Sequence, residues 1–230
     1  MRFMQRTLAA IGFGLVAATA MASTASPVNN VDYVSLETSM ATDAGSKIEV
    51  TEFFSYSCPH CNAFDPDLAA WVKSKGASIV FKRIPVRIHE GDELLQKLYY
   101  TIESMGITEQ MHSKIFHAIH VEHVQFSDAN KIADFMATQG VDRAKFLNAF
   151  DSFSIGPKVQ RANQLTETSK LSSVPMLAID GRYEASIGTT VTAIGNVSHG
   201  ELVAATLKVS DWLLAKAQKE HKLPTATAKK

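Results

Sequence analysis

The chain has 230 residues, and its 23 lysines and arginines balance 23 aspartates and glutamates, so the formal net charge is zero. Proteins held to nucleic acid by overall charge are usually strongly basic, so we expect no nucleic-acid partner. With 46% hydrophobic and 20% charged residues, the composition is that of a globular protein and excludes a disordered chain. The length allows one large domain or two small ones with an adequate core.

The first 22 residues have the pattern of a secretory signal peptide. Arg2 and Arg6 form a positive start, an apolar run covers residues 8–20, and small residues follow at the positions that a signal peptidase reads. A membrane anchor is the alternative, but about 13 apolar residues fall short of the roughly 20 that a spanning helix needs. We therefore predict that residues 1–22 are removed on export, and that the mature chain works where a cysteine pair can stay oxidised.

The first part of the mature chain has the pattern of a strand, a helix and a second strand. Residues 47–54 are rich in β-forming side chains, and residues 78–84 form a second such run, which Pro85 ends. Between them, residues 59–75 carry apolar side chains at helical spacing, and Gly76 closes the helix. This order predicts a βαβ unit with parallel strands.

Helical periodicity dominates residues 92–170. An apolar stripe over residues 94–105 predicts one helix, and Ser127 is expected to cap a second. Residues 146–150 mark a short third helix, and Pro157 suits the first turn of a fourth. This region is therefore expected to be an all-helical insertion in the α/β unit.

Strand patterns return after residue 172. Residues 175–179 predict a strand, Asp180 and Gly181 a turn, and residues 182–187 a second strand. A last amphipathic helix is expected over residues 201–217. The predicted organisation is a signal peptide over 1–22, a first α/β part over 23–86, the helical insertion over 87–170, a second α/β part over 171–222 and a flexible tail over 223–230.

The chemistry centres on Cys58 and Cys61, the two cysteines of the chain, which flank Pro59 and His60 where a helix is expected to begin. Two cysteines at this spacing can form a disulfide. Free N–H groups at the helix N-terminus, together with a protonated His60, stabilise a thiolate on the first cysteine. A lowered pKa makes Cys58 a nucleophile and a good leaving group in thiol–disulfide exchange. Pro59 fits the first turn because no amide hydrogen is needed there.

Two other interpretations of this motif are weaker. A zinc site needs more ligands, such as a second cysteine pair, and the chain has no third cysteine. A purely structural disulfide across so short a loop constrains the unfolded chain little, because the stabilisation grows with loop length. The motif therefore predicts a redox-active disulfide between Cys58 and Cys61, and neither a metal nor a cofactor.

Residues 52–61, which read Glu-Phe-Phe-Ser-Tyr-Ser-Cys-Pro-His-Cys, resemble the active-site strand and helix of the DsbA family, the periplasmic thiol:disulfide oxidoreductases of Gram-negative bacteria. The resemblance extends to Val174-Pro175 and to residues 180–183. It implies a thioredoxin fold with an inserted all-helical domain, in a periplasmic monomer. It also implies that the protein donates its disulfide to reduced, newly exported proteins, and that a DsbB-like quinone-linked membrane oxidase reoxidises it.

The same resemblance assigns roles outside the motif. Pro175 would be cis and face the disulfide, with Val174 as a substrate contact, although sequence alone favours a trans bond. Glu52 would be a buried carboxyl that exchanges protons with Cys61, with Lys82 of the neighbouring strand as its partner. The strand pattern alone also allows a solvent-facing Glu52.

Other polar residues have less distinctive patterns. Asp65, one turn past the motif, is expected to be a solvated helix charge. A group of histidines could bind zinc or copper, but no carboxylate or cysteine completes the ligand set, so solvated or helix-capping side chains are expected. Phe64 belongs either to the core or to a hydrophobic substrate groove. The histidines of this group are His112, His117, His120 and His123.

These patterns together predict an exported dithiol oxidase in which Cys58 attacks and Cys61 resolves the mixed disulfide. A disulfide isomerase or reductase shares this chemistry but usually carries a dimerisation domain, which the segment before residue 47 is too short to hold. The alternative from another class is a periplasmic peptide-binding chaperone that kept the motif as a relic. Such a chaperone would protect unfolded substrates without using its thiols.

Overall fold

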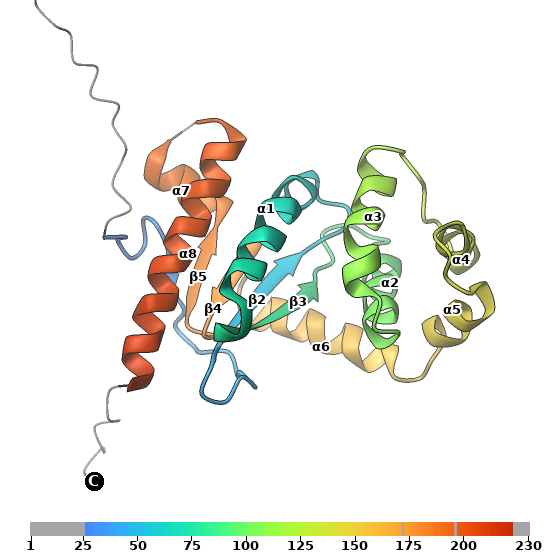
Figure 1. The fold of residues 1–230 in the computed structure, drawn as a ribbon, viewed down its shortest axis with the longest axis horizontal. Coiled ribbons are helices and arrows are strands. Elements are labelled where there is room, and N and C mark those ends of the chain that lie inside the picture. Colours follow the sequence, from blue (N-terminus) through green and yellow to red (C-terminus); the bar gives the residue numbers. More distant parts are fainter. Residues whose placement is uncertain (1–25, 172, 196, 223–230) are drawn as a thin grey trace, which may run out of the picture.

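The computed structural model describes residues 26–171, 173–195 and 197–222, so the predicted signal peptide and tail lie outside the described residues. A five-stranded sheet forms the centre, in the order β1-β5-β4-β2-β3 (Figure 1). None of the described helices is long and apolar enough to cross a bilayer. The strands are β1 Val34–Ser35, β2 Ile48–Phe54, β3 Ile79–Pro85, β4 Met176–Ile179 and β5 Tyr183–Ser186.

The predicted βαβ unit is present. Strands β2 and β3 pair in parallel, and helix α1 (Pro59–Lys75) connects them with the predicted bounds. Gly76 follows α1 with a positive φ of 52°, which glycine adopts without strain. All seven residues of β2 are buried, because the strand lies between β3 and β4 and has covered faces. The strand that leads to the cysteine motif is therefore enclosed along its whole length.

Strands β4 and β5 form the predicted antiparallel hairpin. Asp180 and Gly181 both have positive φ, at 56° and 61°, as the turn requires. Gly181 is also needed for space, because a Cβ there would collide with the main-chain carbonyl of Met40. Strand β4 pairs antiparallel with β2, so the hairpin extends the sheet next to the motif-bearing strand.

One face of the sheet packs against α1 and against α8 (His199–Lys222). Phe64 and Leu68 of α1 are buried there with Leu213 of α8, and the Trp71 indole donates to Asp211 at 2.9 Å. Of the two interpretations of Phe64, the structure therefore supports the core position, with 1% of the side chain exposed.

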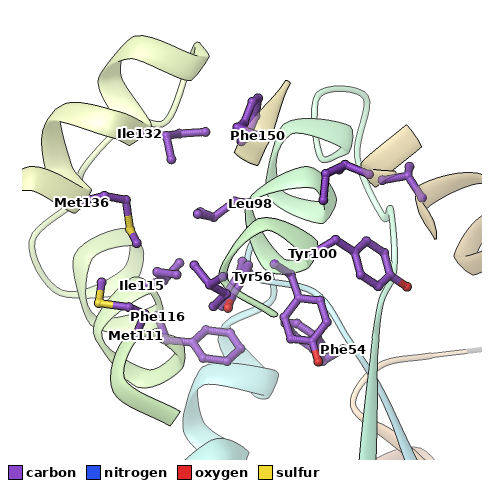
Figure 2. Packing of buried hydrophobic residues seen from close by; sticks show 14 of the residues in the cluster. Phe54, Tyr56, Leu98, Tyr100, Met111, Ile115, Phe116, Ile132, Met136 and Phe150 are labelled. Carbon is purple, nitrogen blue, oxygen red and sulfur yellow. The ribbon is translucent and has the colours of Figure 1, made fainter. Parts of the chain in front are cut away.

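Five helices, one more than the four predicted, lie between β3 and β4 in the chain. Figure 1 shows the first four on the β3 side of the sheet, while the fifth runs back beneath the strands. Their apolar side chains meet in one core, in which Leu98, Ile115 and Met136 are fully buried (Figure 2). The same core includes Phe54 and Tyr56 beside the motif, so it continues up to the cysteines. The helices are α2 Glu93–Ser104, α3 Thr108–His120, α4 Ala129–Thr138, α5 Arg143–Phe150 and α6 Ile155–Thr168.

Several element ends differ from the prediction. The N-cap of α4 is Asp128 and not Ser127, since the Asp128 carboxylate accepts from the amide of Lys131. The second strand of the hairpin stops at Ser186, which begins a capping box for the unpredicted helix α7 (Ile187–Ile194). Strand β1 was also missed, because two residues carry no readable periodicity.

Candidate active site

The first cysteine of the motif lies at the junction between the sheet and α1. Cys58 is the N-cap residue of α1, with φ −86° and ψ 116°, and Pro59 occupies the start of the helix. Both cysteines are free thiols in this structure; Cys58 is 5% exposed and Cys61 is fully buried. A sulfur at the N-cap faces the free N–H groups of the first turn, as the sequence predicts.

The two thiols differ in proton affinity. The pKa of Cys58 is lowered from 9.0 to about 6, mainly because the Cys61 thiol donates a hydrogen bond to it, while partial burial opposes the shift. The amides of Cys61 and His60 and the charge of His60 lower this pKa further. Burial, the same hydrogen bond and the charge of Cys58 raise the pKa of Cys61 strongly. At neutral pH Cys58 is therefore a thiolate, whereas Cys61 keeps its proton.

The hydrogen bond from Cys61 was not predicted, although it is the largest favourable contribution to the Cys58 thiolate. The spacing could have revealed it, because residues three apart at a helix start lie on one face. His60, which was predicted, is exposed, and its ring stacks against His199 with centroids 6.1 Å apart. His199 begins α8 and no sequence pattern relates it to the motif.

The loop before β4 lies next to the Cys58 sulfur. The Val174-Pro175 peptide bond is cis, as the resemblance implies. The Cys58 Sγ lies 3.6 Å from the Val174 carbonyl oxygen, which accepts from Cys58 only when this thiol is protonated. The structure thus brings together the motif and a loop that follows it by more than a hundred residues in the chain.

Glu52 of β2 is fully buried, so the solvent-facing alternative is excluded. Arg83 Nε donates to Glu52 Oε2 at 2.8 Å, and only 8% of the Arg83 side chain is exposed. The pKa of Glu52 rises from 4.5 to about 7, because burial outweighs the attraction of Arg83, and the charge of Asp65 adds to the rise. The Glu52 charge in turn contributes to the raised pKa of Cys61. A carboxyl that titrates near neutral pH is therefore coupled to the buried thiol.

The prediction that Lys82 is the partner of Glu52 is wrong. In the parallel register Arg83 lies opposite Glu52, and Lys82 lies opposite Thr51. Successive side chains of a strand point to opposite faces, so Lys82 turns away from the motif. It pairs with Glu49 at 2.7 Å and also contacts Asp43.

The expectation of a solvated Asp65 is also wrong, since 2% of this residue is exposed. Ser113 Oγ donates to Asp65 Oδ2 at 2.6 Å, and Arg83 Nη2 lies 3.5 Å from Oδ1. Burial opposes ionisation of Asp65, but contacts from His112, Ser113 and Arg83 together lower its pKa. Arg83 therefore lies between two buried carboxylates, Glu52 and Asp65.

The histidines of α3 do not form one group. His112 is buried, contrary to expectation, whereas His117 is exposed and contacts Glu122. His120 is half-buried and donates from Nε2 to the Tyr56 carbonyl oxygen. In the part of the chain that the structure describes, no three histidine, cysteine or carboxylate side chains converge as metal ligands would.

Comparisons with known proteins agree with this geometry. A family model described as a DSBA-like thioredoxin domain matches residues 49–202. The chain is 38% identical over 211 residues to the thiol:disulfide interchange protein DsbA of Bordetella parapertussis, covering 89% of this chain and 96% of that protein. It is 34% identical over 185 residues to the protein of the same name from Pseudomonas aeruginosa PAO1, covering 80% and 83%. The crystal structure of Pseudomonas aeruginosa DsbA superposes with a TM-score of 0.78 at 32% identity, over 87% of this chain and 99% of that one.

Proposed function

The chain belongs to the family of DsbA-like thioredoxin proteins, and from that premise we propose that it donates a Cys58–Cys61 disulfide to newly exported proteins during oxidative folding. The observation that carries this proposal is the contrast between the two thiols at the start of α1. Cys58 is a stabilised thiolate at neutral pH, and Cys61 is buried and protonated. A cysteine with a stable thiolate leaves a disulfide readily, so the oxidised pair is a strong oxidant.

The reaction is a pair of thiol–disulfide exchanges. A substrate thiolate attacks Cys58 Sγ, the bond between Cys58 and Cys61 breaks, and Cys61 leaves with the electron pair and takes up a proton. A second substrate thiolate then attacks the substrate sulfur of the mixed disulfide, and Cys58 leaves as a thiolate. The substrate loses two electrons and gains a disulfide, and the cysteine pair of the protein is reduced. Cys58 is the attacked sulfur because Cys61 is fully buried.

The groups around the motif have supporting roles in this proposal. Glu52, whose pKa is about 7, exchanges the proton of Cys61, and Arg83 replaces the predicted lysine as its partner. The carbonyl of Val174, next to the cis Pro175, lies against Cys58, where the main chain of a bound substrate would pass. His60 supports the Cys58 thiolate with its charge.

The proposed cellular setting follows from the family and the chemistry. The protein acts as a monomer in the periplasm after removal of residues 1–22, and a DsbB-like quinone-linked membrane oxidase restores its disulfide. Relatives carrying the name DsbA include those of Bordetella parapertussis and Pseudomonas aeruginosa. The periplasm suits this chemistry, because disulfides persist in an oxidising compartment.

Oxidation of a reduced peptide with two cysteines tests the proposed function. One equivalent of oxidised protein should convert about one equivalent of peptide to its disulfide, and the released protein should carry two free thiols. A reductive titration in glutathione buffers should yield a potential well above that of a typical structural disulfide. A low potential would contradict an oxidase and indicate a reductase. Suppression of aggregation without any thiol consumption would indicate the chaperone.

A further inference from the structure

Residues 55–57 form the loop that leads from β2 to Cys58, and we call them the Cys58 loop. Its central residue, Tyr56, is 1% exposed although it lies next to the reactive thiol. The Tyr56 ring packs against the rings of Phe54 and Phe116, with both centroid distances at 5.0 Å. Figure 2 shows Tyr56 among the core side chains of the helical insertion. The loop that carries the nucleophile is thus anchored outside the βαβ unit.

The hydroxyl and the carbonyl of Tyr56 both bind to α3. The Tyr56 hydroxyl lies 2.8 Å from His112 Nδ1, and the Tyr56 carbonyl oxygen lies 2.9 Å from His120 Nε2. Phe116 is halfway between the two histidines in the helix, so the three side chains are four residues apart in turn and share one side of α3. This side of α3 therefore forms hydrogen bonds with the hydroxyl and the carbonyl of Tyr56 and packs against its ring.

The groups around Tyr56, His112 and His120 determine which atom donates in each of these two hydrogen bonds. A carbonyl oxygen only accepts, so His120 Nε2 carries a hydrogen. Burial lowers the pKa of His112, and its Nε2 lies 3.4 Å from the Asp65 carboxylate, which accepts only. A neutral His112 therefore carries its single hydrogen on Nε2, on the side of Asp65, and Nδ1 accepts from the Tyr56 hydroxyl. The pKa of Tyr56 is raised well above 10.0 by burial, so this hydroxyl keeps its proton.

The helical insertion also binds the Cys58 loop through Ser57. Ser57 Oγ donates to Asp92 Oδ2 at 2.9 Å, and the same oxygen accepts from the amides of Ile88 and His89 just before α2. Asp92 is 5% exposed. The Cys58 loop is therefore fastened to the segment before α2 through Ser57 and to α3 through Tyr56.

We propose that His112 and His120 are positioning residues that fix the Cys58 loop through Tyr56 and thereby hold the Cys58 sulfur over the N-terminus of α1. This inference deepens the proposed function, because it explains how the insertion serves the reactive thiol. Hydrogen bonds from the Cys61 thiol and from the amides of His60 and Cys61 depend on distance and direction. A Cys58 loop that is free to move would keep these donors in place for only part of the time.

A matched pair of variants at His120 tests the proposal. His120→Leu removes the donor to the Tyr56 carbonyl, whereas His120→Gln keeps an N–H at similar reach. In the reduced protein, titration of thiolate absorbance should show the pKa of Cys58 raised by about half a unit in His120→Leu. His120→Gln should titrate like the unchanged protein. Tyr56→Phe and His112→Leu, which both break the second hydrogen bond, should shift the pKa in the same direction.

Ile132→Val is the control for a general loss of stability. Ile132 is fully buried in the same core, but it lies on α4 and has no polar side-chain atom to bind the loop. This variant should lower the melting temperature and leave the pKa of Cys58 unchanged. An unchanged pKa in His120→Leu would overturn the proposal, and so would an equal shift in Ile132→Val. His120 is half-buried, so its variants test the idea even if His112→Leu does not fold.

The titration detects the thiolate directly and does not depend on substrate oxidation. A protein that fails to oxidise peptides but shows the shift in His120→Leu contradicts the proposed function and supports the positioning role. A protein that oxidises peptides and shows no shift contradicts the positioning role alone.

Discussion

The pKa values of two cysteines within one helical turn are shifted in opposite directions, and the positions of the two residues explain why. Cys58 lies at the N-cap, where amides and the Cys61 thiol donate to it, so its pKa falls to about 6. Cys61 lies inside the first turn, fully buried, so its pKa rises. A shift of three residues along the chain thus separates the attacked sulfur from the resolving one.

The division of roles predicts different trapping by serine variants. Cys61→Ser leaves the Cys58 thiolate to form mixed disulfides that no internal thiol can resolve, so adducts with substrate proteins should accumulate. Cys58→Ser should trap far fewer substrate adducts, because the remaining thiol, that of Cys61, is buried and protonated. Mass spectrometry of adducts from the two variants measures this difference. Equal trapping by both variants would contradict the assignment.

The lowered pKa of Cys58 also predicts how stability depends on pH. A pKa that is lower in the folded state than in the unfolded state adds stability above the unfolded value, and this stability is lost as pH falls through the folded value. With 9.0 for the unfolded and about 6 for the folded thiol, the reduced protein should gain about 1.4 kcal/mol at pH 7 relative to acid. The oxidised protein has no such thiolate and should gain nothing from this source.

Paired denaturant titrations of the reduced and oxidised forms at pH 5 and pH 7 measure this effect. The free energy of unfolding of the reduced form should rise relative to that of the oxidised form as pH increases. A difference that stays constant or shrinks over this interval would show that the Cys58 thiolate is not stabilised by the fold.

At the scale of secondary-structure elements, the pairing of β2 with β3 determines which basic side chain forms ion pairs with the buried carboxyl groups. Lys82 and Arg83 are neighbours in sequence, but side chains alternate along a strand. Arg83 therefore points towards Glu52 and Asp65, whereas Lys82 points to the opposite face and is partly exposed. One position along β3 separates an ion pair that is buried on both sides from one whose lysine is partly exposed.

This alternation predicts unequal costs for the same substitution at adjacent positions. Arg83→Met leaves Glu52 and Asp65 buried without their cation, which should cost about 3–5 kcal/mol of folding free energy. Lys82→Met removes the partner of the buried Glu49, but Lys82 itself is partly exposed, so the loss should be smaller than that for Arg83→Met. Urea denaturation of both variants at pH 7 gives the comparison. A larger loss for Lys82→Met would contradict the assigned partner of Glu52.

At the scale of the whole molecule, the helical insertion and the sheet share one core. Residues next to the motif, such as Phe54 and Tyr56, pack in the same cluster as Leu98 of α2 and Ile115 of α3. Figure 1 places the insertion beside the β3 edge, and the cysteine motif lies where the two parts meet. We therefore expect the two parts to unfold together.

A cavity in the insertion tests this cooperativity. Leu98→Ala removes a fully buried side chain and should cost about 2–5 kcal/mol. Both tryptophans, Trp71 and Trp212, lie in α1 and α8, so their fluorescence reports on the part outside the insertion. The fluorescence midpoint in urea should fall together with the circular-dichroism midpoint. A fluorescence transition that keeps its midpoint would show that the insertion unfolds separately.

Local pattern in the sequence determined the main elements and the reactive pair. The bounds of α1, the parallel pairing of β2 with β3 and the role of the two cysteines follow from periodicity, capping and spacing, which act over a few residues. The cis bond before Pro175 and the burial of Glu52 came from family resemblance, since no local pattern specifies either one.

Only the tertiary structure decided which side chains surround those elements. It placed Arg83 and not Lys82 against Glu52, buried Asp65, and put two histidines of α3 on Tyr56. The contacts of Glu52 with Arg83 and of Tyr56 with the two histidines join residues that are between 31 and 64 positions apart in the chain. Sequence periodicity shows which face of an element is apolar, but it does not show which element covers that face. Register and packing decide this, because they depend on every element of the fold at once.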